Sequence, residues 1–181
     1  MEEIKVLPIA LSKVETRVVF SGLALIAFAV PFSLGDSQFV TGTLVNAALI
    51  FSALALPKKF FVPMIVFPSL GVLSRGFLFG PLTPFLFYFL PFIWVGNLLL
   101  ITAFKRTLAH FSFSFFHAVL IAGLLKFAFL AICAKIFFGF GIIPRLFLTA
   151  MGINQLITAL LGGALSFLLF SLYKQKNFER R

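Results

Sequence analysis

Residues 111–138 read FSFSFFHAVLIAGLLKFAFLAICAKIFF, an apolar run long enough to cross a hydrocarbon core of about 30 Å as one α-helix. The run holds no acidic residue, and one of its two lysines, Lys126, stands near its middle. Five further apolar runs surround it along the chain, at residues 14–32, 39–56, 60–79, 85–104 and 146–173. The turn-forming residues between the runs predict an all-α membrane protein, a bundle of six transmembrane helices in a single domain over residues 1–181.

The composition of the whole chain agrees with this fold class. Of its 181 residues, 61% are hydrophobic and 11% are charged, and the mean hydropathy is +1.14. Soluble domains contain about 45–50% apolar and about 25% charged residues. The composition therefore excludes a soluble enzyme, a built-in ATPase and a long DNA-binding region, and it makes the lipid bilayer the expected surrounding.

The net charge of +10 comes from basic residues that stand mostly at the ends of the apolar runs. This distribution is typical of membrane topology and not of a nucleic-acid-binding surface. Counting Lys and Arg on alternate sides of six spans puts eleven of them on the side that holds both termini. The other side has Lys135 and Arg145 near its loops. We therefore expect a multi-pass protein of the cell membrane with both termini in the cytoplasm.

The first apolar run also has some features of a secretory signal peptide. Basic residues precede it, and the small-x-small pattern of residues 27–29 resembles a cleavage site. Because Glu2, Glu3 and Glu15 dilute the positive charge before the run, we expect it to be a retained helix.

Polar residues inside the predicted spans are the main candidates for function, because a polar side chain in hydrocarbon is unfavourable unless it has a partner or a role. With a helical rise of about 1.5 Å per residue, these side chains fall roughly 6 to 18 Å from the outer ends of their helices. Their convergence would form a polar pocket open to the outside. The predicted substrate-binding residues are Thr43, Asn46, Arg75, Asn97, Lys126, Asn154 and Gln155.

Each of these residues also has a purely structural interpretation. Arg75 is close enough to the outer headgroups to extend its guanidinium to them. Lys126 could bond free backbone carbonyls, and Asn46, Asn97 and Gln155 could bond neighbouring helices. Residues 68–71, PSLG, leave two possibilities open for the third span: a kink resolved by packing, or a broken helix that exposes backbone groups to a ligand.

The signs of the buried charges indicate both the ligand and the energy source. Arg75 and Lys126 are cations, whereas Glu15 and Asp36 lie near the membrane edges and no acid lies deep in a span. A cationic pocket favours a carboxylate, a phosphate or a polarised carbonyl on the ligand. Carriers driven by protons or sodium usually need an intramembrane carboxylate, so we expect an external source of energy.

Catalytic and metal sites are not indicated. His110 and His117 have no acid or cysteine near them in sequence, and Cys133 is the one cysteine. We expect no enzymatic activity, no metal and no cofactor.

Four motifs resemble the substrate-binding S components of energy-coupling factor (ECF) vitamin transporters, in particular an uncharacterised S-component-like group. They are TGxxVNA at 41–47, PSLxxLSxG at 68–76, PFIxxGN at 91–97 and QLxTALxGG at 155–163. Size and topology are similar over the whole chain. The resemblance implies capture of a small micronutrient, a vitamin or related compound, from outside the cell.

The resemblance also implies protein partners, namely a membrane T component and two cytoplasmic ATPases. In this family the T component packs on small residues of the first helix, which here gives Ser21, Gly22, Ala24 and Ala27 as predicted docking residues. Members that transport nickel or cobalt use a histidine after the initiator methionine, where this chain has Glu2. A metal substrate is therefore not expected.

Two other classes of function stay open at this stage. The chain could be a non-transporting scaffold or accessory subunit, with its polar residues serving only to join helices. It could also be an autonomous small carrier or channel.

Overall fold

The computed structural model describes residues 9, 11–34, 37–79, 83–110 and 114–178, and every regular element in these ranges is a helix. Five helical segments are long and apolar enough to cross a membrane: Lys13–Leu34, Gln38–Ala55, Pro84–Ala109, Phe115–Gly139 and Leu146–Gln175. The prediction of an all-α fold with several helices of membrane-spanning length is confirmed. The elements are α1 (Lys13–Leu34), α2 (Gln38–Ala55), η1 (Lys58–Phe60), α3 (Phe61–Phe79), α4 (Thr83–His110), α5 (Phe115–Gly139), α6 (Leu146–Ala150) and α7 (Ile153–Phe178).

Local side chains explain where α1 and α2 begin. Ser12 and Glu15 form a reciprocal capping box, in which Ser12 N donates to Glu15 Oε2 over 2.9 Å and Glu15 N donates to Ser12 Oγ over 3.2 Å. Ser37 Oγ accepts from Val40 N over 3.4 Å at the start of α2. These side chains satisfy amide donors that the first turn of a helix leaves without a backbone partner.

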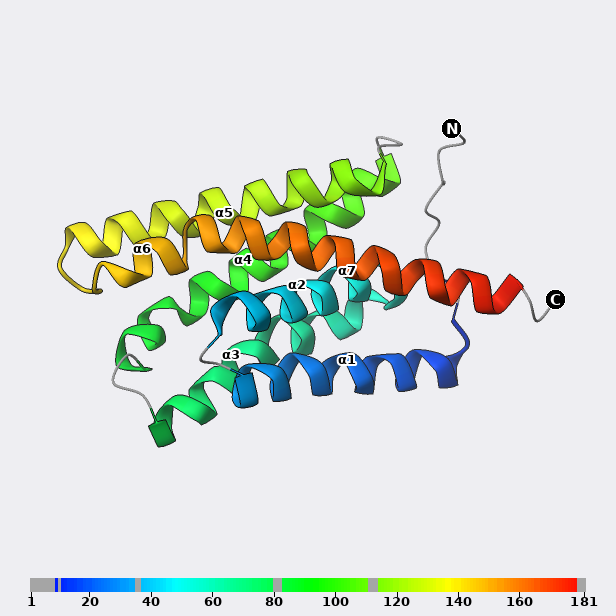
Figure 1. Ribbon diagram of the computed structural model, residues 1–181, viewed down its shortest axis with the longest axis horizontal. Coiled ribbons are helices and arrows are strands. Elements are labelled where there is room, and N and C mark those ends of the chain that lie inside the picture. The colour runs from blue at the N-terminus through cyan, green and yellow to red at the C-terminus, as the bar shows by residue number, and fades with distance from the viewer. Residues whose placement is uncertain (1–8, 10, 35–36, 80–82, 111–113, 179–181) are drawn as a thin grey trace.

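The helices form one bundle around α2. Figure 1 shows the long helices running roughly along one axis, and α2 contacts α1, α3, α4 and α7. The main core packs the inward residues of α2 against α1, α4, α5 and α7, while a second cluster around Phe89 joins α4, α5 and α6. Helix α1 begins and helix α7 ends at the same end of the bundle (Figure 1).

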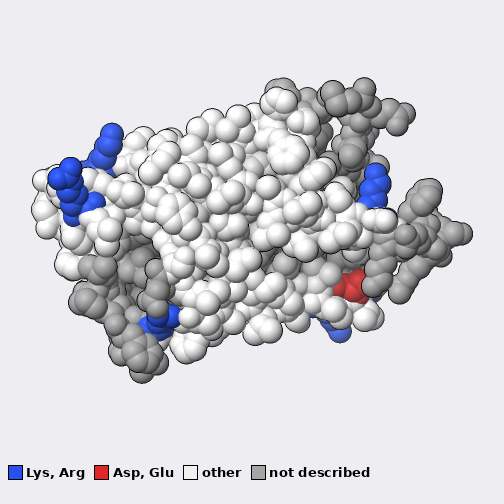
Figure 2. All heavy atoms as spheres, in the orientation of Figure 1, with Lys and Arg blue, Asp and Glu red and all other residues white. Residues whose placement is uncertain are grey.

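Charged side chains gather at the two ends of the bundle, and the surface between them is uncharged on the face shown in Figure 2. This apolar belt is what a membrane-embedded surface requires. At the end where α1 begins lie Lys13, Arg17, Lys58, Lys59, Lys105, Arg106 and Lys174. At the opposite end lie Arg75, Lys135 and Arg145.

The structure differs from the predicted spans at three places. The predicted span 146–173 is divided into α6 and α7 by a turn at Met151 and Gly152, where a Cβ on Gly152 would collide with the carbonyl oxygen of Leu148. Helix α4 continues through the predicted connection 105–110. The predicted fifth span began at residue 111, but residues 111–113 lie outside the described residues and α5 begins at Phe115.

The alternative of a broken third helix is not what the structure shows. Helix α3 is continuous over Phe61–Phe79 with Pro68 inside it. Proline removes one backbone donor, but neighbouring helices can supply replacement hydrogen bonds. A bond from α4 reaches the same turn: Asn97 Nδ2 donates to the carbonyl oxygen of Ile65 over 3.1 Å, one residue after Met64, whose carbonyl Pro68 leaves without its helical donor.

Candidate functional site

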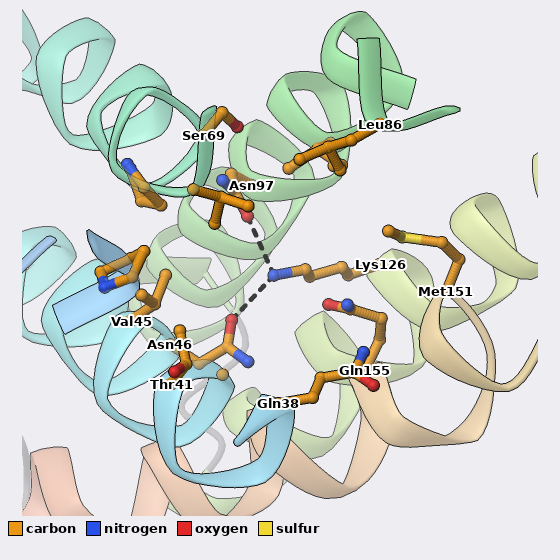
Figure 3. A pocket seen from close by; sticks show the side chains of 15 residues that line it. Gln38, Thr41, Val45, Asn46, Ser69, Leu86, Asn97, Lys126, Met151 and Gln155 are labelled. Carbon is orange, nitrogen blue, oxygen red and sulfur yellow. Dashed lines mark hydrogen bonds between the residues drawn. The ribbon is translucent and has the colours of Figure 1, made fainter. Parts of the chain in front are cut away.

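A cavity of about 220 Å³ is drawn in Figure 3, and its lining includes Pro31 near the end of α1 and Gln38 at the start of α2, which places it in the half of the bundle opposite to the start of α1. Every long helix contributes to its wall, and the turn between α6 and α7 closes one side. The lining residues are Pro31, Gln38, Thr41, Gly42, Val45, Asn46, Pro68, Ser69, Val72, Leu86, Ile93, Asn97, Lys126, Met151 and Gln155. The cavity therefore joins segments that are far apart in the sequence.

Among the described residues of this wall, Lys126 is the one that carries a charge. It lies on the inward face of α5, in helical register with the buried residues Ala122 and Leu130, and is itself 3% exposed. Its Nζ donates to Asn46 Oδ1 over 2.7 Å and to Asn97 Oδ1 over 2.9 Å (Figure 3). The helical period thus places Lys126 on the buried face of α5, where its ammonium group meets two asparagine side chains.

The two asparagines are oriented by bonds on their other side. Asn46 Nδ2 donates to Thr158 Oγ1 over 3.1 Å, and Asn97 Nδ2 donates to the carbonyl oxygen of Ile65 over 3.1 Å. Since their amide nitrogens are used in this way, their oxygens face Lys126. The resulting cluster, Lys126 with Asn46, Asn97 and Thr158, connects α5 to α2, α4 and α7.

The positive charge of Lys126 has no acidic partner among the described residues. Glu15 is the one acid in these ranges, and it is engaged with Ser12 at the start of α1. An ammonium group carries three donors, and the described contacts of Lys126 use two of them. The described contacts therefore leave one donor of Lys126 unused, and they bring no negative charge close to its ammonium group.

Ser69 is a second polar group in the cavity wall, and sequence reasoning did not select it. The residue is 3% exposed, and its Oγ has no hydrogen-bond partner in the described part of the chain. A buried hydroxyl without a partner is unfavourable by about 1–3 kcal/mol. Its only sequence signal was its place beside Pro68, which had suggested a helix break instead of a ligand contact.

A second network ties the α6–α7 turn to α2. Gln38 Nε2 donates to the carbonyl oxygen of Ala150 over 2.7 Å, and Gln155 Nε2 donates to the same oxygen over 3.1 Å. Asn154 Nδ2 donates to Gln38 Oε1 over 2.8 Å. These bonds satisfy a carbonyl that the end of α6 leaves free and hold Met151 against the cavity.

The structure thus brings four of the seven predicted residues into one wall: Asn46, Asn97, Lys126 and Gln155. Asn154 stands behind the wall, bonded to Gln38. Thr43 is half-buried outside the wall, where its backbone oxygen faces Gly162 of α7. Gln38, which belonged to a predicted connection, lines the cavity instead.

Arg75 is not part of the cavity wall. Its Nη1 donates to the carbonyl oxygens of Phe32 over 3.2 Å and Ser33 over 2.9 Å, in the last turn of α1. A cation that bonds the free carbonyls at a helix C-terminus also complements the helix dipole. The contacts of Arg75 match a structural role at the C-terminal end of α1, and its role in substrate binding stays a prediction.

The predicted docking residues do not form one accessible stripe. Ser21 and Gly22 are exposed, but Ala24 is 8% exposed and Ala27 is fully buried in the main core. Residues spaced by three along a helix share a face, and here that face meets α2 and α3 of the same chain. In this structure Ala24 and Ala27 pack inside their own chain, and the docking role of the four residues stays a prediction.

Groups that could perform metal or acid–base chemistry are scattered. Within the described ranges no three His, Cys, Asp or Glu side chains lie close enough to hold a metal ion. His117 is exposed and pairs with Ser114 Oγ through Nδ1 at 2.6 Å, and Cys133 is buried in the second core cluster. The side chain of His110 lies outside the described residues.

The arrangement around Lys126 is suited to hold a small polar molecule by hydrogen bonds and charge. Its wall offers a cation from α5, a hydroxyl from α3, further amide and hydroxyl groups, and apolar side chains. Concave, mostly apolar cavities with a few convergent polar groups are the usual form of ligand sites. No family model, curated protein or solved structure matches the chain, so the chemistry of this site carries the functional assignment.

Proposed function

We propose that this protein is the substrate-binding subunit of an ECF-type importer, an S component that captures a small micronutrient from outside the cell. The observation that carries the proposal is the cavity of about 220 Å³ that every long helix lines and that contains Lys126. It lies at the end of the bundle remote from the described basic residues at the start of α1, which would face the cytoplasm. The expected topology is six spans in the cell membrane, with both termini inside.

The source of energy would be separate subunits. In the described ranges the bundle interior contains a lysine and amides but no carboxylate that could bind a coupling proton or sodium ion. A T component and two cytoplasmic ATPases would supply this function. Ser21 and Gly22 remain on the free face of α1, where such a partner could pack.

A non-transporting scaffold is the second candidate, and the mutual bonding of the polar cluster favours it. Asn46 bonds Thr158 of α7 and Asn97 bonds α3, which is how polar groups join helices in membranes. The cavity and the unpartnered Ser69 hydroxyl have no role in a scaffold. They favour a ligand.

Binding without independent transport is the first expected result. Native mass spectrometry of gently purified protein should show one recurring small-molecule adduct. Uptake in a host lacking the system should require the coexpressed T component and ATPases, and it should survive a collapsed proton gradient while ATP is maintained. Absence of any adduct would contradict the binding role, and concentrative uptake by this chain alone would refute the subunit assignment.

The topology gives a second expected result. Cysteines introduced at Lys58 and Lys176 should react with membrane-impermeant reagents from the cytoplasmic side only, because both positions belong to the basic end of the bundle. A cysteine at Ser37, the exposed cap of α2, should react from outside only. Cys133 is buried, and a Cys133→Ala background removes its signal. Labelling of positions 37 and 58 from one side would rule out this topology.

A further inference from the structure

The cavity specifies the chemistry of its ligand more narrowly than the proposed function does. We infer that it binds a small amphipathic monoanion, a monocarboxylate, whose oxygens accept hydrogen bonds from Lys126 Nζ and Ser69 Oγ. This inference rests on the proposed function and names the class of substrate. Its argument has three parts: charge, available donors and the apolar wall.

The first part is charge. Lys126 is buried in the bundle, and the described acceptors around it are two neutral amide oxygens. A buried charge is strongly unfavourable unless it is paired as well as hydrogen-bonded. One carboxylate neutralises one ammonium, whereas a phosphate of higher charge would need further cations, and no other lysine or arginine lines the cavity. The charge balance therefore indicates a ligand with a single negative charge.

The second part is the set of donors that remain for a ligand. Thr41 Oγ1 donates to the carbonyl oxygen of Leu34 over 2.7 Å, and the amide nitrogens of Asn46 and Asn97 each use one of their two N–H donors on a protein acceptor. Lys126 keeps a third donor, and Ser69 Oγ is buried in the same wall without a partner. A carboxylate has two acceptor oxygens, which matches the number of these two donors.

The third part is the rest of the wall. It includes five apolar side chains, namely Val45, Val72, Leu86, Ile93 and Met151. The volume of about 220 Å³ lies below the range of about 300–1,000 Å³ typical of drug-sized ligands. The ligand is therefore small, with an apolar body attached to its acidic group.

Isosteric pairs of probes test this inference on the unmodified protein. In nanodiscs, thermal unfolding is followed with butanoate and butanamide, 3-methylbutanoate and its amide, and benzoate and benzamide. At least one carboxylate should raise the midpoint of unfolding, and its amide should need at least a tenfold higher concentration for the same shift. Charge-assisted hydrogen bonds contribute about 1.5–3 kcal/mol, which corresponds to roughly tenfold to hundredfold in affinity.

Matched variants identify the two donors. Lys126→Met should weaken the preferred carboxylate by roughly tenfold to hundredfold and abolish its advantage over the amide. Ser69→Ala should weaken it by roughly twofold to tenfold, as expected for one hydrogen bond. Ser166→Ala is the control, because Ser166 Oγ is also buried and unpartnered but lies outside the cavity wall. Its carboxylate affinity should equal that of the parent.

Three results overturn the inference: an amide that binds as well as its carboxylate, unchanged carboxylate binding by Ser69→Ala, or no binding of any of the six probes by the parent. The native mass spectrum then separates this failure from failure of the proposed function. A neutral or cationic adduct means that only the ligand class is wrong. A parent that shows no adduct and binds no probe means that the solute-binding role is wrong as well.

Discussion

Replacing Gly162 by alanine is expected to lower the free energy of unfolding by about 3 kcal/mol, the upper end of the range for overpacking. A Cβ at this position would lie 2.7 Å from Ala47 N, 2.8 Å from Asn46 Cβ and 2.8 Å from Thr43 O. Two of these are backbone atoms, which cannot rotate away, so α2 and α7 would have to separate. Such a separation would also displace Asn46 from Lys126 and weaken probe binding.

Gly22→Ala provides the control for this substitution. Gly22 is also inside a helix, but a Cβ there would meet nothing within 4 Å. Because glycine is a poorer helix former than alanine, Gly22→Ala should be neutral or slightly stabilising. Unfolding in mild detergent, followed by circular dichroism, measures both variants. Equal midpoints for Gly162→Ala and the parent would show that α2 and α7 do not pack as closely as described.

The helices could be predicted from the sequence because the bilayer leaves few alternatives to a long apolar helix. Lys126, Asn46 and Asn97 could also be predicted as a group, since polar residues in hydrocarbon seek one another. Their shared depth was readable from the helical rise, and the structure places all three within hydrogen-bonding distance.

The remaining features depend on which residues touch across the folded chain, and the spacing of residues along a helix does not give this information. The sequence depth of Arg75 is compatible with a pocket or with a membrane interface. In the structure its guanidinium bonds the carbonyl oxygens of Phe32 and Ser33, which the sequence does not reveal. Ala24 and Ala27 have the spacing of a docking face, but the spacing is the same whether the neighbour is another protein or the same chain. Ser69 gave only a weak signal, its place beside Pro68, because serine is common in membrane helices, where it usually bonds its own backbone.

Asn46→Leu is expected to lower the free energy of unfolding by about 3 kcal/mol, because a buried ammonium loses one of its hydrogen-bond acceptors. The change removes the acceptor 2.7 Å from Lys126 Nζ and also the donor to Thr158 Oγ1. Lys126→Met should also destabilise, because two buried amide oxygens lose their donor. Each single variant thus leaves buried polar groups without partners.

The double variant Asn46→Leu with Lys126→Met removes both members of the pair, so its destabilisation should fall short of the sum of the singles by about 1–3 kcal/mol. Ser171→Ala is the control. Gly162 of α7 lies against Asn46, and Ser171 is nine residues further along the same helix, about 13 Å away. Its hydroxyl donates to the carbonyl oxygen of Phe167 in the same helix. Combined with Asn46→Leu, its effect should add within about 0.5 kcal/mol.

Additive effects for the Asn46 and Lys126 pair would instead mean that Asn46 does not stabilise the ammonium group of Lys126. Lys126 would then be held by other groups, and the charge argument for an anionic ligand would lose its basis. A coupled pair that still leaves one lysine donor and the full positive charge unmatched is the arrangement that a bound carboxylate completes.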